Sequence, residues 1–240
     1  MIGIIGFGRF GKLTARYLAE DFEVKVYTAP GKTDEVVRLG SVVDSLEAVC
    51  AQKLVILCVP ISAMEPTLKR IAPMLNPGTV VVDVCSVKTL PARWMTEALP
   101  DHVSILATHP MFGPDSAADS LSGRKIVLCR VRIEEKRFDN MLAYLTAKGL
   151  KVFDTSPEEH DRQIAVTLAL THFIGRSLAR FGAEDLPIDT EGYKRLRHIL
   201  GVVENDTWQL FEDMNRYNPY AQDARKRFMA AMSDIDGRLE

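Results

Sequence analysis

The chain has 240 residues, of which 47% are hydrophobic and 26% are charged. This apolar content is enough for a real core, so it excludes a disordered or low-complexity protein. Lysine and arginine total 30 against 32 aspartate and glutamate residues, which leaves a net charge of −2. A nearly neutral balance disfavours a protein that binds the phosphate backbone of nucleic acids. We therefore expect no nucleic-acid partner.

The sequence shows no segment that favours a membrane or secreted location. Its longest apolar stretch, Leu54–Met64, is interrupted by Pro60 and Ser62 and is shorter than the ~20 residues of a membrane-crossing helix. No targeting segment is visible, and none of the four cysteines forms the C-x-x-C pair of a zinc or redox site. We expect a cytoplasmic protein with reduced cysteines, no metal ion and no membrane partner.

Residues 1–153 alternate short β-rich runs with helical segments. Several of the runs are apolar throughout, as in parallel strands that are covered on both faces. The predicted strands are Ile2–Ile5, Val24–Thr28, Leu54–Val59, Thr79–Val84, Val103–Ala107 and Lys125–Cys129. Helical spacing of apolar residues predicts helices over Phe10–Glu20, Met64–Leu75 and Leu90–Leu99. The alternation predicts an α/β domain of the Rossmann type, with a doubly wound, mostly parallel sheet.

Residues 154–240 show helical patterns only. The segment Ser156–Glu159 is typical of a helix start, with a capping serine, a proline at the first helical position and acids in the first turn. This helix is predicted to run to Phe181 and Gly182, and two further helices are predicted over Glu191–Arg216 and Pro219–Gly237. We expect a smaller all-α domain that forms a homodimer, because so short a segment has a small core of its own.

A glycine-rich motif marks the first predicted turn. Its residues are Gly6, Phe7, Gly8, Arg9, Phe10 and Gly11. The motif follows a strand and opens a helix, which is the context that a dinucleotide-binding G-x-G-x-x-G requires. The first glycine permits a tight turn, the second lets the backbone approach a pyrophosphate, and the third lets the helix pack closely on the strand. We expect these six residues to bind the cofactor, together with Val59 and Pro60 at the end of another strand.

The end of the second predicted strand bears on the choice between NAD and NADP. NAD enzymes normally carry an acid about 20 residues after the glycines, which holds the 2′-hydroxyl of the ribose. This chain has no acid there before Asp34, whereas Thr28 and Lys32 offer donors to a 2′-phosphate. The sequence therefore favours NADP, and NAD remains the alternative.

Two polar segments, Asp83–Lys88 and Thr108–Asp115, follow neighbouring predicted strands. A sheet of this class binds its ligand beyond the carboxyl ends of its strands. A dehydrogenase that oxidises an alcohol needs a group to accept the hydroxyl proton, and neutral histidine suits that role near pH 7. His109 is our candidate for this base. Ser86 is a candidate hydrogen-bond partner for the substrate hydroxyl or for the imidazole.

The same residues carry a family likeness. Motifs occur in one order at Gly6–Gly11, Asp83–Lys88, Thr108–Pro114, His160–Asp161, Thr171–Arg176, Pro187–Tyr193 and Glu204–Tyr217. Together they resemble the prephenate/arogenate dehydrogenases of tyrosine biosynthesis, and within them the plant-type arogenate dehydrogenases. The likeness implies oxidative decarboxylation of a cyclohexadienol: hydride leaves ring C4, the C4 hydroxyl loses its proton to His109, and CO2 departs.

The resemblance also implies residues that contact the substrate. His172 and Thr190 of the helical domain would contact the substrate, although His172 by itself is equally explained as a core histidine. Asp206 stands where the plant enzymes place an acid that pairs with the ammonium of arogenate; prephenate carries a keto group instead. Arg176 and Lys88 are candidates to hold the substrate carboxylates. Leu168 departs from the glutamine expected in the plant enzymes.

Three other functions remain open on the sequence. A prephenate dehydrogenase that uses NAD or NADP differs from the favoured function only in the substrate side chain. A short β-hydroxyacid dehydrogenase shares the plan of the fold, but the lysine base near a glycine-rich motif that is typical of that class is not found after residue 154. A non-catalytic NAD(P) sensor would have no use for Ser86 and His109.

Overall fold

The computed structural model of the chain describes residues 1–203 and 205–239. The chain divides into two compact units, Met1–Pro157 and Glu158–Glu240. We had expected the boundary after residue 153, but the last strand of the first unit continues to Asp154. Among the described residues, no helix is both long and apolar enough to cross a lipid bilayer.

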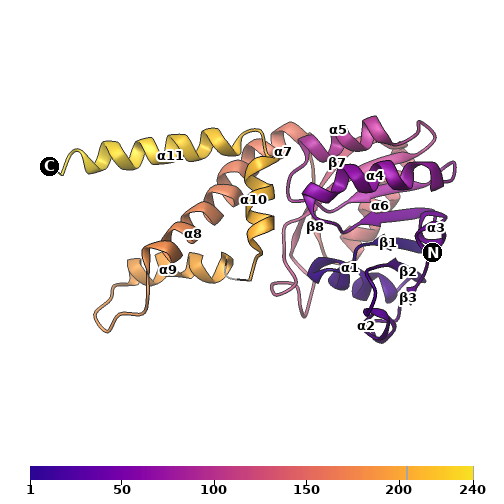
Figure 1. The fold of residues 1–240 in the computed structure, drawn as a ribbon, viewed down its shortest axis with the longest axis horizontal. Coiled ribbons are helices and arrows are strands. Elements are labelled where there is room, and N and C mark those ends of the chain that lie inside the picture. The colour runs from indigo at the N-terminus through magenta and orange to yellow at the C-terminus, as the bar shows by residue number, and fades with distance from the viewer. Residues whose placement is uncertain (204, 240) are drawn as a thin grey trace. The chain divides into compact units, whose positions relative to one another are not determined.

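The first unit is built on an eight-stranded sheet (Figure 1) with the order β3-β2-β1-β4-β5-β6-β7-β8. All neighbouring pairs are parallel except β6 with β7. This confirms the doubly wound, mostly parallel Rossmann-type sheet. The strands are β1 (Ile2–Ile5), β2 (Val24–Tyr27), β3 (Val42–Val43), β4 (Leu54–Leu57), β5 (Val80–Asp83), β6 (Ser104–Pro110), β7 (Lys125–Arg132) and β8 (Lys151–Asp154).

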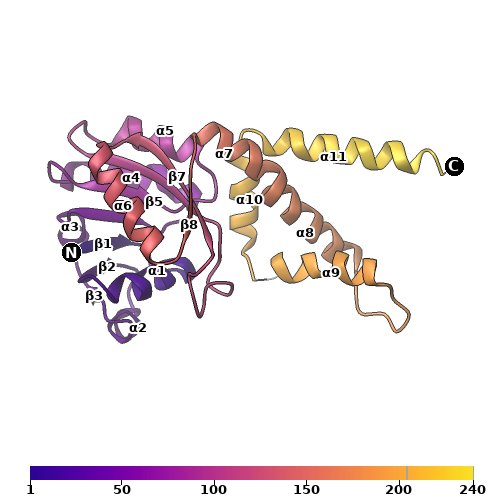
Figure 2. The same ribbon diagram turned by 180° about the vertical axis from the view of Figure 1, so that it is seen from behind.

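Helices cover both faces of this sheet. The helices α4 and α5 lie in front of it in Figure 1, whereas α1 and α6 lie in front in the reverse view of Figure 2. Short 3₁₀ turns at Ile61–Ala63 and Ala72–Met74 flank α4. The helices of this unit are α1 (Arg9–Ala19), α2 (Thr33–Arg38), α3 (Leu46–Cys50), α4 (Met64–Ile71), α5 (Thr89–Ala98) and α6 (Glu135–Ala147).

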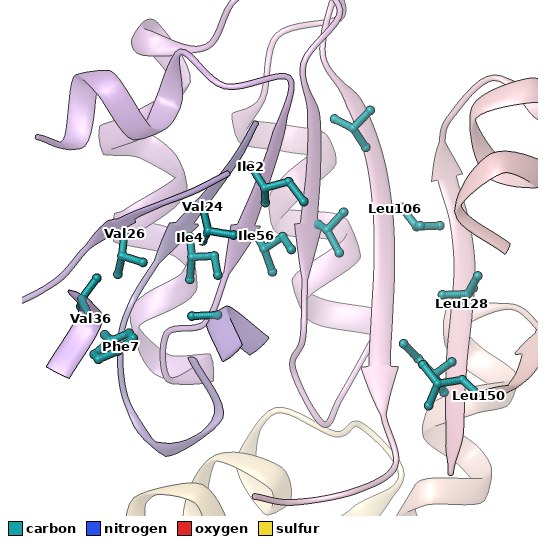
Figure 3. Close-up of a cluster of buried hydrophobic side chains, with 14 of the residues drawn as sticks. Ile2, Ile4, Phe7, Val24, Val26, Val36, Ile56, Leu106, Leu128 and Leu150 are labelled. Carbon is teal, nitrogen blue, oxygen red and sulfur yellow. The ribbon is translucent and has the colours of Figure 1, made fainter. Parts of the chain in front are cut away.

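The core on the α1 side follows from the two-residue period of the strands. Alternate residues of the strands are buried together there, with Ile2 and Ile4 on β1 and Leu106 on β6 (Figure 3). Ala15 of α1 and Phe138 of α6 pack into the same cluster and are fully buried. A cavity of about 400 Å³ remains on this side, lined by apolar residues of the sheet, α1 and α6.

The second unit consists of helices. Residues Ala165–Leu170 form a π-helical segment inside the long predicted first helix, and Gly182, with φ of +87°, ends that helix as predicted. Gly175 lets α8 cross α9 closely, because a Cβ there would lie 2.9 Å from Val203 Cγ1. The helices are α7 (Pro157–Ile164), α8 (Thr171–Phe181), α9 (Glu191–Val203), α10 (Trp208–Arg216) and α11 (Ala221–Asp236).

The prediction of one helix over Glu191–Arg216 is wrong. The structure has two helices there, because α9 ends at Val203 and α10 begins at Trp208. Thr207 has an extended backbone, and its side chain accepts a hydrogen bond from the amide of Leu210 at 3.1 Å. This N-cap starts a new helix, and the apolar spacing on either side does not reveal it.

Candidate active site

The glycine turn between β1 and α1 has three glycines with three different environments. Gly6 has φ of +99°, and a Cβ there would lie 2.3 Å from the carbonyl oxygen of Cys58. A Cβ on Gly11 would lie 2.3 Å from the oxygen of Gly6, so this glycine lets α1 approach the strand. A Cβ built on Gly8 would have no neighbouring atom within 4 Å. The open side at the start of α1 therefore fits the pyrophosphate of a dinucleotide.

The other motif residues differ in accessibility. Phe7 belongs to the buried core, whereas Val59 flanks the turn, with its Cγ1 3.2 Å from a Cβ built on Gly6. Pro60 is exposed and precedes the 3₁₀ turn after β4. Contact of these residues with a cofactor stays a prediction.

The loop that follows β6 is fastened to α1. Arg9 Nη2 lies 2.6 Å and 2.7 Å from the two carboxylate oxygens of Asp115. The rings of Phe10 and Phe112 lie 6.1 Å apart, and the Tyr17 hydroxyl donates to the oxygen of Ala117 at 2.9 Å. These contacts join the glycine-motif helix to the loop that carries the T-H-P-M-F-G-P run.

The end of β2 is rich in charge. Thr28 follows the strand and is half-buried, and Lys32 is exposed on the loop before α2. Lys32 Nζ lies 3.7 Å from a carboxylate oxygen of Glu35, and Lys12 of α1 donates a hydrogen bond to the other oxygen. The Lys12 hydrogen bond is the main reason that the pKa of Glu35 lies below its usual value. Two ammonium groups therefore share one carboxylate here.

The expectation that Lys88 holds a substrate carboxylate is wrong in this structure. Lys88 and Asp83 form an ion pair in which both side chains have 0% exposure. Lys88 Nζ also donates to the backbone oxygen of Thr108 at 2.5 Å, and Asp83 accepts from the amides of Cys85 and Thr108. The lysine joins the ends of β5 and β6 inside the protein, where a solvent-borne substrate does not reach it.

Ser86 follows β5 and His109 lies near the end of the neighbouring strand β6, at the same edge of the sheet. Asp83 of β5 pairs with Ala107 of β6. Ser86 lies three positions after Asp83, and His109 lies two positions after Ala107. The Ser86 hydroxyl oxygen is buried and has no hydrogen-bond partner among the described residues, which is costly unless a ligand supplies one. His109 is 5% exposed.

His109 lies inside a strand and not after one. β6 extends to Pro110, because His109 pairs with Val127 of the antiparallel strand β7. The predicted strand ended at Ala107, since the polar Thr108 and His109 break the apolar run. A strand position holds the imidazole more rigidly than a loop position does.

In the second unit, three predicted substrate contacts lie together. His172 and Arg176 are one turn apart on α8. His172 Nε2 lies 3.7 Å from Asp206 Oδ2, and Arg176 donates to the Asp206 backbone oxygen. The Arg176 guanidinium also lies over the ring of Trp208, 4.6 Å from its centroid.

Two buried polar atoms of this cluster are available to accept or donate a further hydrogen bond. His172 is 2% exposed, and neither its Nδ1 nor Arg176 Nε has a hydrogen-bond partner among the described residues. Burial lowers the pKa of His172, Asp206 raises it and Arg176 lowers it, with a net fall below the ordinary value. The imidazole is therefore neutral near pH 7 and offers a hydrogen bond without a charge.

The other predicted substrate residues are outside this cluster. Thr190 is exposed, and its hydroxyl accepts a hydrogen bond from the amide of Tyr193 at 3.2 Å, at the start of α9. Leu168 is half-buried in the π-helical segment. Glu204, which begins the last matching motif, lies outside the described residues. For Thr190, substrate contact stays a prediction.

Comparisons with known proteins identify the family. The family model of the prephenate dehydrogenase nucleotide-binding domain matches residues 22–153. Arogenate dehydrogenase 2, chloroplastic, of Arabidopsis thaliana is 32% identical over 99% of this chain and 70% of its own length. The chain belongs to the prephenate/arogenate dehydrogenase family. The motifs at Gly6–Gly11 and Thr108–Pro114 predict this family, and the comparisons confirm it.

Further matches cover the C-terminal part of the chain and its fold. A model of the TYRAAT1-like C-terminal domain matches residues 177–240. Arogenate dehydrogenase 1, chloroplastic, of Arabidopsis thaliana is also 32% identical, over 99% of the chain, but the chain spans only 39% of its length. Prephenate dehydrogenase from A. aeolicus, solved with hydroxyphenyl propionate and NAD+, has a TM-score of 0.79 at 20% identity, covering 100% of this chain and 91% of its own. This last likeness shows the fold.

Sequence reasoning missed several residues around the candidate site. Lys12 and Glu35 lie outside the glycine motif and 23 positions apart, so no local pattern signals their ion pair. Trp208, which stacks on Arg176, was read as part of a continuous helix. The pairing of Arg9 with Asp115 joins residues 106 positions apart, and no local pattern predicts it.

Proposed function

We propose that the chain catalyses the NADP-dependent oxidative decarboxylation of arogenate to tyrosine. The observation that carries the proposal is the carboxyl edge of the sheet. It presents an open helix start at Gly8, an unpartnered hydroxyl at Ser86 and the imidazole of His109. A phosphate-binding turn and a proton acceptor are the two parts that alcohol oxidation needs. The relatives named arogenate dehydrogenase support the substrate.

In this mechanism His109 takes the proton of the ring hydroxyl while hydride leaves the carbon that bears it. Bound NADP supplies the hydride acceptor. Ser86 donates a hydrogen bond that orients the hydroxyl or the imidazole, and this also satisfies its buried oxygen. The ring carboxylate leaves as CO2 and its bonding electrons enter the ring, which becomes an aromatic phenolate. The phenolate oxygen then takes back the proton that His109 holds. General-base assistance of this kind contributes roughly 10²–10⁴-fold in rate.

The residues of the second unit hold the substrate side chain in this proposal. Asp206 pairs with the ammonium of arogenate, His172 donates or accepts a hydrogen bond, and Arg176 attracts a carboxylate. The 3.7 Å between His172 Nε2 and Asp206 Oδ2 supports a shared role for these two residues. Thr190 completes the predicted set. Prephenate, with a keto group, leaves the acid without a partner.

The cofactor preference is proposed from the charge at the end of β2. Thr28 and Lys32 offer donors there, and Lys12 adds a second ammonium group. The residues of the glycine motif would hold the pyrophosphate, with Arg9 and Phe10 opening α1 beside it. NAD is the alternative cofactor.

We further propose a homodimer through the helical unit, in a reducing compartment such as the cytoplasm. Met229, Met232 and Ile235 are exposed at helical spacing on α11, with 49%, 51% and 61% exposure. An apolar stripe of this kind is typical of an interface. The four cysteines are free thiols, which agrees with a reduced environment. Light scattering on the purified chain measures the mass of the assembly.

The test is an absorbance assay for the reduced nicotinamide with each cyclohexadienol and each cofactor. We expect turnover of arogenate with NADP, and a loss of roughly 10²-fold or more in His109→Asn without loss of cofactor affinity. Faster turnover of prephenate would make the chain a prephenate dehydrogenase. Binding of NADP without turnover of either substrate would make it a sensor and would refute the proposal.

A further inference from the structure

The apolar cavity of about 400 Å³ on the α1 side of the sheet takes no part in the proposed reaction. Its floor is formed by strand residues such as Ile56 and Leu106 (Figure 3). Although β4 and β5 are central strands, Ile56 and Val82 retain 7% and 5% exposure on this face. On the other face, Val55 and Val81 of the same strands have 0% exposure. The side chains and helices on the α1 side therefore leave the middle of the sheet incompletely covered.

The walls of the cavity are rich in aromatic side chains. At the carboxyl end of the sheet, the rings of Phe10 and Phe112 lie 6.1 Å apart. At the amino end, the rings of Phe22 and Tyr144 lie 5.2 Å apart. Met141 of α6 adds a thioether, which packs favourably on aromatic rings. Aromatic walls over an aliphatic floor favour a ligand with rings, because ring–ring contacts add to the free energy of apolar burial.

The hydroxyl groups that line the cavity already have partners. The Thr14 hydroxyl donates to the backbone oxygen of Phe10 at 3.0 Å. The Thr108 hydroxyl donates to the backbone oxygen of Asp83 at 2.6 Å. The Tyr17 hydroxyl is likewise bonded to a backbone oxygen of the loop after β6. These hydroxyl groups therefore do not require a polar ligand.

The amino end of the cavity carries an excess of negative charge. Lys148 Nζ lies 3.0 Å from a carboxylate oxygen of Glu20 and 2.6 Å from one of Asp21. The Tyr144 hydroxyl also donates to Asp21, at 2.8 Å. The hydrogen bond from Lys148 lowers the pKa of Asp21, so this carboxylate stays ionised near pH 7. Two carboxylates thus share one ammonium group, and this end of the cavity disfavours an anionic ligand.

We propose that the cavity binds a neutral ligand of about two to three aromatic rings. An apolar cavity of ~150 Å³ stays dry and takes up one benzene, so the larger volume here fits a ligand of that size. The ligand supplies contacts that the floor and the walls lack, and it removes their apolar surface from solvent. The site is separate from the candidate base. Thr108 and Pro110 line the cavity, and the two-residue period of β6 directs His109 to the opposite face.

The test uses two fluorescent probes that share one ring system and differ in charge. N-phenyl-1-naphthylamine is neutral, and 8-anilino-1-naphthalenesulfonate carries an added sulfonate group. The emission of both rises in an apolar site, so titration of the folded chain measures their affinities. We expect saturable binding of the neutral probe at a single site per chain. The sulfonate should bind about tenfold more weakly, because its charge meets the carboxylates and finds no free cation.

Two substitutions on the α6 wall should fill the cavity. Met141→Trp and Leu145→Trp each place a larger ring system at a residue that lines it. Each should weaken binding of the neutral probe by about tenfold and raise the melting temperature by about 2–4 °C, because the added ring occupies the empty volume. Ala143→Trp is the matched control, since Ala143 is exposed on the same helix and does not line the cavity. It should change neither quantity.

The outcomes decide what occupies the cavity. Absence of saturable binding of the neutral probe to the folded chain would overturn the inference, as would binding that both tryptophan variants leave unchanged. Equal affinity for the two probes would overturn the preference for a neutral ligand. Loss of probe binding as the chain self-associates would make a second copy of the chain the occupant in place of a small molecule. The titrations contain neither cofactor nor cyclohexadienol, so their result is independent of the proposed function.

Discussion

Asp83 and Lys88 form an ion pair from which water is excluded, five residues apart at the end of β5. The aspartate also accepts hydrogen bonds from two backbone amides, and the lysine donates a hydrogen bond to a backbone oxygen of β6. A buried pair satisfied in this way fixes the spacing of two strands, and it does so at the edge where Ser86 and His109 emerge. The pair therefore acts on the active site through geometry and not through contact with the substrate.

Removal of one partner of this pair should lower the free energy of unfolding more than removal of both. Lys88→Met leaves a buried carboxylate without its cation, and we expect a loss of about 3–5 kcal/mol in the free energy of unfolding. The double variant Asp83→Asn/Lys88→Met should recover part of that loss. Urea unfolding monitored by circular dichroism measures both. Equal stability of Lys88→Met and the exposed-site control Lys69→Met would contradict the structural role.

Alanine at two glycines of the turn should separate binding from folding. At Gly8 the added methyl group meets open space, so Gly8→Ala should fold, with a stability loss of at most ~1 kcal/mol at this N-cap position. Its cofactor affinity should fall by about tenfold or more, because the methyl group occupies the place of the pyrophosphate. At Gly11 the methyl group would meet the backbone oxygen of Gly6 at 2.3 Å. Gly11→Ala should therefore lose at least ~2 kcal/mol of stability.

Thermal unfolding and cofactor titration of these two glycine variants give both readouts. If Gly8→Ala bound NADP as tightly as the parent chain, the pyrophosphate would have to lie elsewhere.

The stability of the protein should depend on pH through His172. Burial lowers the pKa of this histidine in the folded chain below the ordinary 6.5. Between that lowered pKa and 6.5 the unfolded chain binds the proton and the folded chain does not, so the free energy of unfolding falls as pH drops below 6.5. His172→Asn should remove this part of the pH dependence. Denaturation midpoints at pH 7.5 and 5.5 measure it, and an identical slope in parent and variant would exclude the effect.

Substitution of Asp206 should change substrate choice. In Asp206→Asn the ammonium of arogenate loses its ionic partner while the keto group of prephenate gains an amide donor. We expect the ratio of kcat/KM for arogenate to that for prephenate to fall by roughly tenfold or more. Asp223→Asn is the matched control, since Asp223 forms an exposed ion pair with Arg227 on α11 at 2.8 Å. An unchanged ratio would remove Asp206 from substrate recognition.

The sequence predicted the parts of the fold that rest on local patterns. Apolar runs such as Leu54–Val59 and the glycine motif indicated the parallel sheet and the turn between its first strand and α1, and the structure confirms both. The edge strand β3 has two residues, and β8 is largely exposed, so neither forms an apolar run. Helix α10 was missed because its N-cap, Thr207, interrupts a helical pattern without a glycine or proline.

For the candidate site, the sequence indicated which residues are candidates, but it did not indicate their burial or their contacts. Ser86, His172, Arg176 and Asp206 were found from their motifs. The burial of Lys88 depends on Asp83 and on an adjacent strand twenty residues further on, and spacing alone does not reveal it. The same holds for Lys12 and Glu35, which meet across 23 positions of the chain.

The loop between β6 and β7 has a consequence for the order of events in catalysis. Arg9, Phe10 and Tyr17 of α1 anchor it. His109 lies just before the loop, where its backbone pairs with Val127 of β7. The proposed base is thus held in place before either reactant binds, so little reorganisation is needed when the substrate arrives. A substitution of one of these anchoring residues, although remote from the reacting ring, would therefore lower turnover, because the imidazole would be held less rigidly.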